Sequence, residues 1–229
     1  MASGLYFDNF VQAWKLARID RALMSNMIIT VCALALVIAI GAFAAYPLAR
    51  HQTRFNNFMY GFFVACLIVP ALTILVPLYK FIVDIGGMNQ YWAIIFIQVT
   101  FSLPLTIFLI TGFMGSVPRE LDEAGWMDGC SRYAIFFRII LPLLKPVVAT
   151  IMIIIGVQVW NDYQFSVFFL QMPGRQTIPV ALSMFISQFH SNVHWVAAGC
   201  FISMLPLTVL YLSLQKYFIK GMADGAIKG

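Results

Sequence analysis

The stretch "SNMIITVCALALVIAIGAFAAYPL", residues Ser25–Leu48, decides the fold of this chain. It contains no Asp, Glu, Lys or Arg in 24 consecutive positions. About 20 apolar residues in a helix cross the hydrocarbon core of a bilayer. A membrane β-barrel would instead show segments of about ten residues that alternate between apolar and polar. The stretch therefore predicts a membrane-spanning helix.

The whole chain has the same character: 62% of its residues are hydrophobic and 10% are charged, against about 25% charged in a soluble domain. The basic residues are scattered along the sequence, which argues against nucleic-acid binding. The four cysteines are far apart and predict neither disulfides nor a metal site. We expect an all-α integral membrane protein with five transmembrane helices. The four further spans are Phe58–Tyr79, Tyr91–Gly112, Leu143–Trp160 and Trp195–Gln215.

The distribution of Lys and Arg predicts the orientation, because cytoplasmic segments carry the excess of basic residues. Nine basic residues fall on one side of the predicted spans and five on the other, Lys15, Arg18, Arg21, Lys80 and Arg175. We therefore expect the loop 113–142 and the C-terminus in the cytoplasm. Residues 1–24 should form an external amphipathic segment, with a helix on the outer interface, and residues 25–229 the transmembrane domain.

The loop 113–142 contains the passage "PRELDEAGWMDGCSRYAIFFRIILP", Pro118–Pro142, which has seven of the 23 charged residues of the chain. It predicts a short helix with Ser116 or Val117 as its cap and with acidic residues in its first turns. Gly129 would end this helix in a left-handed conformation, and Ser131 would cap a second helix. The small residues Ala124 and Gly125 would permit close approach of a partner, although a simple interfacial helix fits the pattern equally well.

This passage resembles the cytoplasmic signature of the membrane subunits of binding-protein-dependent ABC importers. Glu123, Ala124 and Gly125 are followed by Gly129, and Ile139, Leu141 and Pro142 follow at the spacing of that signature; only Gly125 departs from the usual Ala. The stretches "AAYPLAR", "VQVWNDY" and "LQKYFIKGMADGAIKG" are similar to the maltose-type, carbohydrate-importing branch. The resemblance extends over nearly the whole chain.

The resemblance implies an ABC importer type I permease bundle, which normally has six spans, so that the first helix of the family is expected upstream of this sequence. Such a subunit forms half of a pathway for a carbohydrate in a bacterial or archaeal cytoplasmic membrane. Its partners would be a cytoplasmic ATPase dimer that binds ATP and Mg, a second permease subunit, and an external solute-binding protein. The implied ATPase-coupling residues are Glu123, Ala124, Gly125, Asp128, Gly129, Ile139, Leu141 and Pro142. The sequence contains no G-x-x-x-x-G-K-[ST] phosphate loop, so we expect a non-catalytic subunit.

Three polar residues, Gln158, Asn161 and Asp162, lie at the outer end of the fourth span and are candidates for lining the pathway, or for anchoring the helix at the interface. His190 and His194 have the spacing of a helical metal pair, but no acidic residue lies near them and we expect no metal site. The C-terminal tail either reaches the ATPases or is a solvated basic end.

Other functions are compatible with a membrane-spanning chain. The permease could serve another solute, such as a polyol, glycerol phosphate or an oligopeptide. A secondary carrier or channel would be expected to show internal repeats and an ionisable residue at mid-membrane, and neither is visible in the sequence. A membrane scaffold would use the cytoplasmic passage for docking alone.

Overall fold

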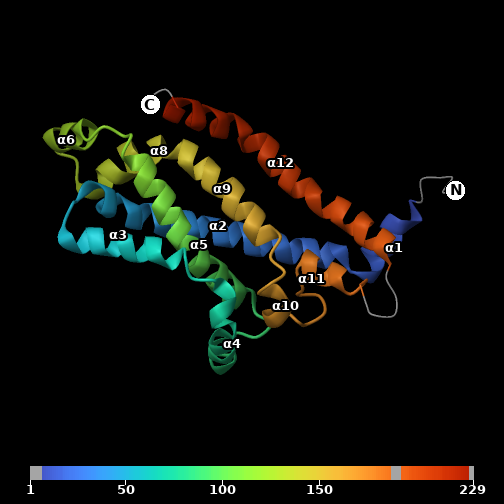
Figure 1. Ribbon diagram of the computed structural model, residues 1–229. Helices are drawn as coiled ribbons and strands as arrows, with labels where there is room; N and C mark the ends of the chain where they lie inside the picture. The colour runs from blue at the N-terminus through green and yellow to red at the C-terminus, as the bar shows by residue number, and fades with distance from the viewer. Residues whose placement is uncertain (1–6, 187–191, 227–229) are drawn as a thin grey trace. The chain divides into compact units, whose positions relative to one another are not determined.

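The computed structural model describes residues 7–186 and 192–226, with side chains described up to residue 215, and in these residues it contains helices and no strand. Figure 1 shows the helices in chain order. Their bounds are α1 Asp8–Leu16, α2 Ile19–Arg50, α3 Arg54–Cys66, η1 Ala71–Ile74, α4 Leu75–Asp84, α5 Tyr91–Met114, α6 Glu120–Met127, α7 Arg132–Ala134, the π-helical turn η2 Ile135–Ile140, α8 Leu141–Leu143, α9 Lys145–Trp160, α10 Ser166–Phe169, α11 Ile178–Ser183 and α12 Val193–Ala226.

Three helices are long and apolar enough to cross a membrane: α2, α5 and the part of α12 from Val193 to Gln215. They contain the first, third and fifth predicted spans. Each also contains a proline, Pro47, Pro104 or Pro206 respectively. These three predictions are confirmed.

The second predicted span, Phe58–Tyr79, is not one straight helix. It falls on α3 and on η1 with α4, and the two parts meet at an angle of 91°. Pro70 lies in the break between Cys66 and Ala71. Proline has no backbone N–H to donate and disfavours helical geometry in the residue before it, which is sufficient to end α3 here.

The fourth predicted span, Leu143–Trp160, corresponds to α9, which is bent by 69° from the helical segment Arg132–Leu143 before it. Pro142 and Pro146 flank the bend and remove two backbone donors from it. Counting each bent pair as one span gives up to five spans by length and composition.

The predicted amphipathic helix near the N-terminus is present as α1, but the long helix α2 already begins at Ile19. Arg18 separates the two with a positive φ of 49°, a left-handed conformation that a helix cannot continue through.

The chain divides into two compact units, and α2, α5, α9 and α12 contribute residues to both. Unit one comprises Met1–Ala33, Ile74–Gln98 and Gly156–Leu210. Its core contains small side chains from α1 and α2 packed with Trp160, Ile178, Leu182 and Phe185. Gly199 on α12 is approached so closely by Leu182 that a larger side chain would collide there.

Unit two comprises Leu34–Thr73, Val99–Ile155 and Tyr211–Gly229. Within it, α2 and α5 are close enough that a Cβ on Gly41 would lie 2.5 Å from the Thr106 Cγ2 atom. The turn from α2 into α3 is held by Asn56, whose side-chain amide donates to the carbonyl oxygens of Pro47 and His51 at 3.1 and 2.7 Å. Unit two contains the charged passage predicted from the sequence.

Candidate functional site

The charged passage forms the short helix α6, which begins one residue after Arg119. The amides of Asp122 and Glu123 donate to the Arg119 carbonyl at 2.9 and 3.2 Å. The predicted cap at Ser116 or Val117 is wrong, because the Ser116 hydroxyl instead donates to the Phe113 carbonyl at the end of α5. Glu120, Asp122 and Glu123 occupy the first turn of α6, as predicted, where the helix dipole favours acidic side chains.

The helix α6 ends in a Schellman motif, as the sequence predicted from Gly129. Gly129 has a φ of 76°, and no atom would obstruct a Cβ there, so the backbone conformation alone demands glycine. The Cys130 amide donates to the Gly125 carbonyl at 2.9 Å and the Gly129 amide to the Trp126 carbonyl at 3.0 Å. Ser131 then caps α7 by accepting a hydrogen bond from the Ala134 amide at 3.3 Å, which confirms that prediction.

Gly125 and Ala124 face different environments. Gly125 is buried against η2, and a Cβ on it would lie 2.9 Å from Ile135 Cγ1 and 3.0 Å from Ile139 Cδ1. Ala124 is exposed on the same helix. The sequence suggested that both small residues permit close approach of a partner protein. In the structure, Gly125 instead permits close packing of α6 against η2 of the same chain.

Asp122 is joined to the end of α2 by an ion pair and a hydrogen bond. Its Oδ2 atom lies 2.9 Å from Arg50 Nη2, with the two side chains 16% and 8% exposed respectively. The Tyr46 hydroxyl donates to Asp122 Oδ1 at 2.6 Å. Asp122 thus has a structural use that its neighbour Glu123 lacks in this structure, since Glu123 is exposed.

Arg50 also binds the backbone between α5 and α6. Its guanidinium donates to the carbonyl oxygens of Val117 at 3.0 Å, Pro118 at 3.4 Å and Met114 at 3.5 Å. One side chain therefore connects the ends of α2 and α5 to the start of α6. In the sequence, Arg50 is one of the nine basic residues on the side predicted to be cytoplasmic. The signal for its structural role was an arginine at the end of an apolar span, followed later by a short acidic helix.

The outward surface of α6 combines charge with exposed apolar atoms. Glu123, Ala124 and Asp128 are exposed, and Met127 is 89% exposed. The Arg132 guanidinium lies 5.6 Å from the centre of the Trp126 ring. A pocket of about 550 Å³ adjoins this surface and is lined by Tyr46, Arg50, His51, Arg119, Asp122, Glu123, Trp126, Met127 and Arg132.

The remaining predicted coupling residues lie in the segment that follows α6. Ile139 is half-buried beside Gly125, Leu141 is half-buried, and Pro142 is exposed in α8 next to the bend. Of these three, Ile139 packs beside α6, whereas Glu123, Ala124, Asp128 and Gly129 are exposed on the surface at α6.

The candidate pathway residues belong to unit one and have unequal surroundings. The carboxylate of Asp162 accepts hydrogen bonds from nearby residues. Oδ1 accepts from the Phe165 amide at 3.2 Å, and Oδ2 accepts from the Ser166 amide and hydroxyl at 2.9 and 2.7 Å. Asn161 is exposed and donates to the Val157 carbonyl of its own helix. Gln158 is exposed on α9. The geometry gives Asp162 a capping role at the start of α10 and leaves Asn161 accessible.

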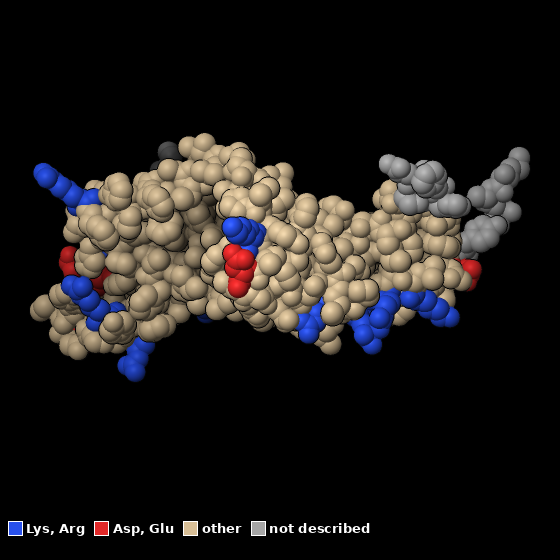
Figure 2. All heavy atoms as spheres, turned by 90° about the horizontal axis from the view of Figure 1, so that it is seen from below, with Lys and Arg blue, Asp and Glu red and all other residues tan. Residues whose placement is uncertain are grey.

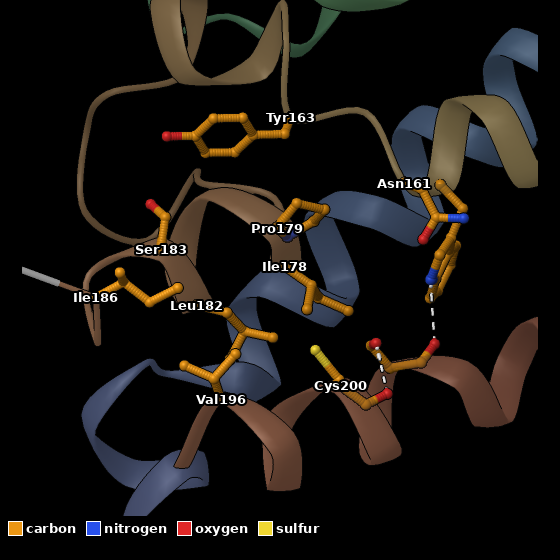
Figure 3. Close-up of a pocket in the computed structure, with 11 residues that line it drawn as sticks. Asn161, Tyr163, Ile178, Pro179, Leu182, Ser183, Ile186, Val196 and Cys200 are labelled. Carbon is orange, nitrogen blue, oxygen red and sulfur yellow. Dashed lines mark hydrogen bonds between the residues drawn. The ribbon is translucent and has the colours of Figure 1, made fainter. Parts of the chain in front are cut away.

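Asn161 lines a pocket of about 510 Å³ in unit one, and so does Tyr163, two residues further along the chain (Figure 3). The pocket is lined by Trp160, Asn161, Tyr163, Ile178, Pro179, Leu182, Ser183, Ile186, Val196, Cys200 and Ser203. Trp160 is fixed in the wall because its indole N–H donates to the Ser203 carbonyl at 3.1 Å. Aromatic rings with a few polar groups form a surface suited to a polar solute that also has apolar faces.

A buried amide, Asn26, joins three helices of unit one and was not singled out from the sequence. Its side chain is on α2 and is 1% exposed. It donates to the Trp160 carbonyl at the end of α9 at 2.7 Å and accepts from the Ile178 amide at the start of α11 at 2.9 Å. Both groups are helix ends, which need partners when buried.

Among the described residues, no group of three or more His, Cys, Asp or Glu side chains is arranged to hold a metal ion. His190 lies outside the described residues. The backbone of α12 continues as a helix to Ala226, and the side chains of the predicted tail beyond residue 215 also lie outside the description.

Comparison with known proteins gives consistent matches over most of the chain. A family model described as "Binding-protein-dependent transport system inner membrane component" matches residues 21–224. The melibiose, raffinose and stachyose import permease of Bacillus subtilis is 46% identical over 224 residues, 97% of this chain and 81% of that protein. The trehalose and maltose transport permease of Thermococcus litoralis is 30% identical over 211 residues, 91% of this chain and 76% of that protein.

Solved structures share the fold. A chain of a bacterial ABC transporter that imports the acidic polysaccharide alginate superimposes with a TM-score of 0.77 at 20% identity, covering 93% of this chain and 80% of the other. A chain of an inward-facing methionine ABC transporter gives a TM-score of 0.67 at 14% identity, covering 91% and 96%.

Proposed function

The chain belongs to the family of binding-protein-dependent transport system inner membrane components, and from this premise we propose that it forms half of the translocation pathway of an ATP-driven carbohydrate importer. It would couple that pathway to a cytoplasmic ATPase in a bacterial or archaeal inner membrane. The single observation that carries the coupling role is the fixed, exposed acidic helix α6.

The proposed solute class rests on the relatives. Two similar permeases are named for oligosaccharides or disaccharides, melibiose with raffinose and stachyose at 46% identity and trehalose with maltose at 30% identity. A third relative, at 33% identity over 206 residues, is named for maltodextrin in Bacillus subtilis. These names favour a carbohydrate over a polyol, glycerol phosphate or an oligopeptide.

The physical requirement for coupling is a helix that stays in place when it is pushed or pulled. α6 meets this requirement in three ways: Asp122 is tied to Arg50, Gly125 is seated against Ile135, and Gly129 closes its end. Its free surface, with Glu123 and Met127, is then available to a partner. Because the helix is held at both ends, force on that surface would be transmitted to α2 and α5.

We propose the partners that this role requires. They are a dimer of cytoplasmic ATPases, which would bind ATP and Mg, a second permease subunit in a heterodimer, and an external solute-binding protein. This chain would bind no cofactor and would hydrolyse no ATP itself. Asn161 is the strongest candidate among the three predicted pathway residues, because it is exposed and it alone of the three lines the pocket in unit one.

The decisive experiment reconstitutes the importer in liposomes with its ATPase and measures sugar uptake and ATP hydrolysis together. Glu123→Lys should abolish ATP-driven uptake with only a small loss of thermal stability, because Glu123 is exposed although it lies in the first turn of α6. The matched control is Asp84→Lys, another charge reversal at an exposed acidic residue outside α6, which should transport normally.

Normal uptake by a correctly assembled Glu123→Lys complex would remove α6 from the coupling path. Uptake by this chain without any ATPase would instead support a secondary carrier. Asn161→Ala should change the uptake rate at saturating sugar while leaving basal ATP hydrolysis intact; unchanged uptake would exclude Asn161 from the pathway.

A further inference from the structure

Two arginines of unit one converge on a single glycine. A Cβ on Gly174 would lie 3.2 Å from Arg21 Nη1 and 3.8 Å from Arg18 Nη1. These two distances limit the separation of the two guanidinium nitrogens to about 7 Å, a range at which like charges repel. Gly174 has a φ of 91°, so the loop both bends and leaves free the space that a side chain would fill.

Neither arginine forms an ion pair with an acidic side chain that the structure describes. Among the side chains that the structure describes, the only ion pair is Arg50–Asp122, and Arg18 and Arg21 are both exposed. The next residue of the loop, Arg175, is held in place: its guanidinium donates to the Asn89 carbonyl at 2.6 Å and to the Gln90 side chain at 2.8 Å. Figure 2 shows a row of basic side chains along this part of the chain. An anion between Arg18 and Arg21 would relieve their repulsion.

The position along α2 indicates which anion. α2 has 32 residues and is therefore about 48 Å long, well beyond the hydrocarbon thickness of about 30 Å. Arg18 immediately precedes α2 and Arg21 lies in its first turn, so with the uncharged stretch Ser25–Leu48 in the hydrocarbon core both side chains would reach the level of the lipid headgroups. Basic side chains at that depth attract anionic lipids.

The surface next to the arginines is apolar and exposed. Met24, Met27 and Val31 follow Arg21 along α2 and are 62%, 44% and 55% exposed. On the preceding helix α1, Trp14 is 43% exposed, and Trp side chains prefer the membrane–water interface. A phosphate at Arg21 would therefore place acyl chains against Met24, Met27 and Val31.

We propose that Arg18 and Arg21, drawn together over Gly174, bind the phosphate of an anionic phospholipid in the leaflet that faces the N-terminal residues. This site is separate from α6 and goes beyond the proposed transport function. It would add a polar link at the junction between α1 and α2, where Arg18 has a positive φ and the buried side chains of Ala17 and Ile19 already pack in the core.

The test uses the full chain in a neutral detergent, titrated with phosphatidylglycerol or phosphatidylcholine, with bound lipid counted by native mass spectrometry. Phosphatidylglycerol should bind and phosphatidylcholine should not. Each arginine is expected to contribute about fivefold to the affinity, so Arg18→Gln with Arg21→Gln should weaken binding about 25-fold. Lys80→Gln, which removes an exposed charge elsewhere in unit one, is the matched control and should bind as the unaltered chain does.

Two further measurements keep the proposal testable if the double variant does not fold. Sodium chloride should weaken phosphatidylglycerol binding to the unaltered chain. Gly174→Ala keeps every charge but places a methyl group against Arg21, and it should also weaken binding.

Several results would overturn the proposal. Undiminished phosphatidylglycerol binding by the double variant, or an equal loss in Lys80→Gln, would show that these arginines form no site. Binding of inorganic phosphate at this site as tightly as phosphatidylglycerol would identify a site for a free anion. Variants that retain lipid binding but lose association with the external solute-binding protein would identify a protein-docking surface.

Discussion

Arg50 is the residue on which the local structure of unit two depends. Its side chain is 8% exposed and bonds to Asp122 and to three backbone carbonyls. An ion pair so little exposed gains little net stability by itself, because both groups lose their hydration. Removing one partner is costly, however, because the other charge is then left unpaired. The pair is thus better understood as a device that fixes where α6 lies.

The first prediction follows from this asymmetry. Asp122→Asn should lower the free energy of unfolding by about 1–3 kcal/mol, since it leaves the Arg50 guanidinium without its counter-charge. Thermal unfolding in detergent measures this. Arg119→Gln, which removes an exposed arginine next to the same helix, is the control and should have little effect.

A double variant, Arg50→Met with Asp122→Leu, distinguishes the pair from its members. If the ion pair matters as a pair, the double variant should lose less stability than the sum of the two single changes. Strict additivity would show that Arg50 acts through the carbonyls of Val117 and Pro118 alone.

A second prediction concerns Gly129. Its φ of 76° costs a residue with a Cβ about 1–2 kcal/mol. Gly129→Ala should therefore open the end of α6 and increase hydrogen exchange of the Cys130 amide about tenfold. Gly129→Asn should have a smaller effect, because Asn tolerates this conformation better. Equal exchange in all three chains would contradict the Schellman assignment.

At the scale of the element, α6 has an inner face and an outer face that the sequence did not separate. The third prediction compares neighbouring residues. Gly125→Leu should lower thermal stability because the side chain would collide with Ile135 and Ile139. Ala124→Leu, one position away and exposed, should leave stability unchanged but reduce ATP-driven uptake by blocking the docking surface.

The measurements for this comparison are thermal unfolding and uptake by the reconstituted importer. A stable Gly125→Leu chain would place α6 away from η2. Unaltered uptake by Ala124→Leu would show that the exposed face of α6 tolerates bulk and makes no close contact with a partner.

The limits of the sequence are also clearest at this scale. Gly129 and Ser131 could be predicted because their roles depend on the backbone within a few residues. Gly125 could not be placed on the inner face, because that depends on where Ile135 comes to lie after the chain reverses. The second and fourth spans were predicted as single helices, but they are bent by 91° and 69°, and such angles depend on packing that no local pattern contains.

At the scale of the whole molecule, the apolar runs were sufficient to predict an all-helical chain, and three of five spans are continuous helices. The tertiary links were not predictable. Asn26 forms hydrogen bonds with residues more than 130 positions away in the sequence. In the sequence it is a single polar residue near the start of an apolar span, and nothing local indicates these partners. Asp162 was predicted to line the pathway or anchor the helix because it is a charged residue near the end of a span. Its carboxylate instead accepts hydrogen bonds from Ser166 at the start of α10.

The fourth prediction tests the orientation of the chain. In a background without the four native cysteines, Lys15→Cys should react with a membrane-impermeant maleimide added outside intact protoplasts. Met127→Cys, on the 89% exposed position of α6, should react only after the membrane is opened. Labelling of Met127→Cys from outside would place α6 on the outer face and would exclude contact with a cytoplasmic ATPase.

The π-helical turn η2 separates the seat of α6 from the span that follows it. A π turn holds one residue more than an α turn, and each residue of an α-helix turns the chain by about 100°. The direction in which Ile135 points is therefore fixed by a count of residues, whatever their chemistry. Deleting one residue between Ile135 and Ile140, such as Phe136, would convert the π turn into a regular α-helical turn. Ile135 would then be rotated away from Gly125, although every residue of the signature would still be present.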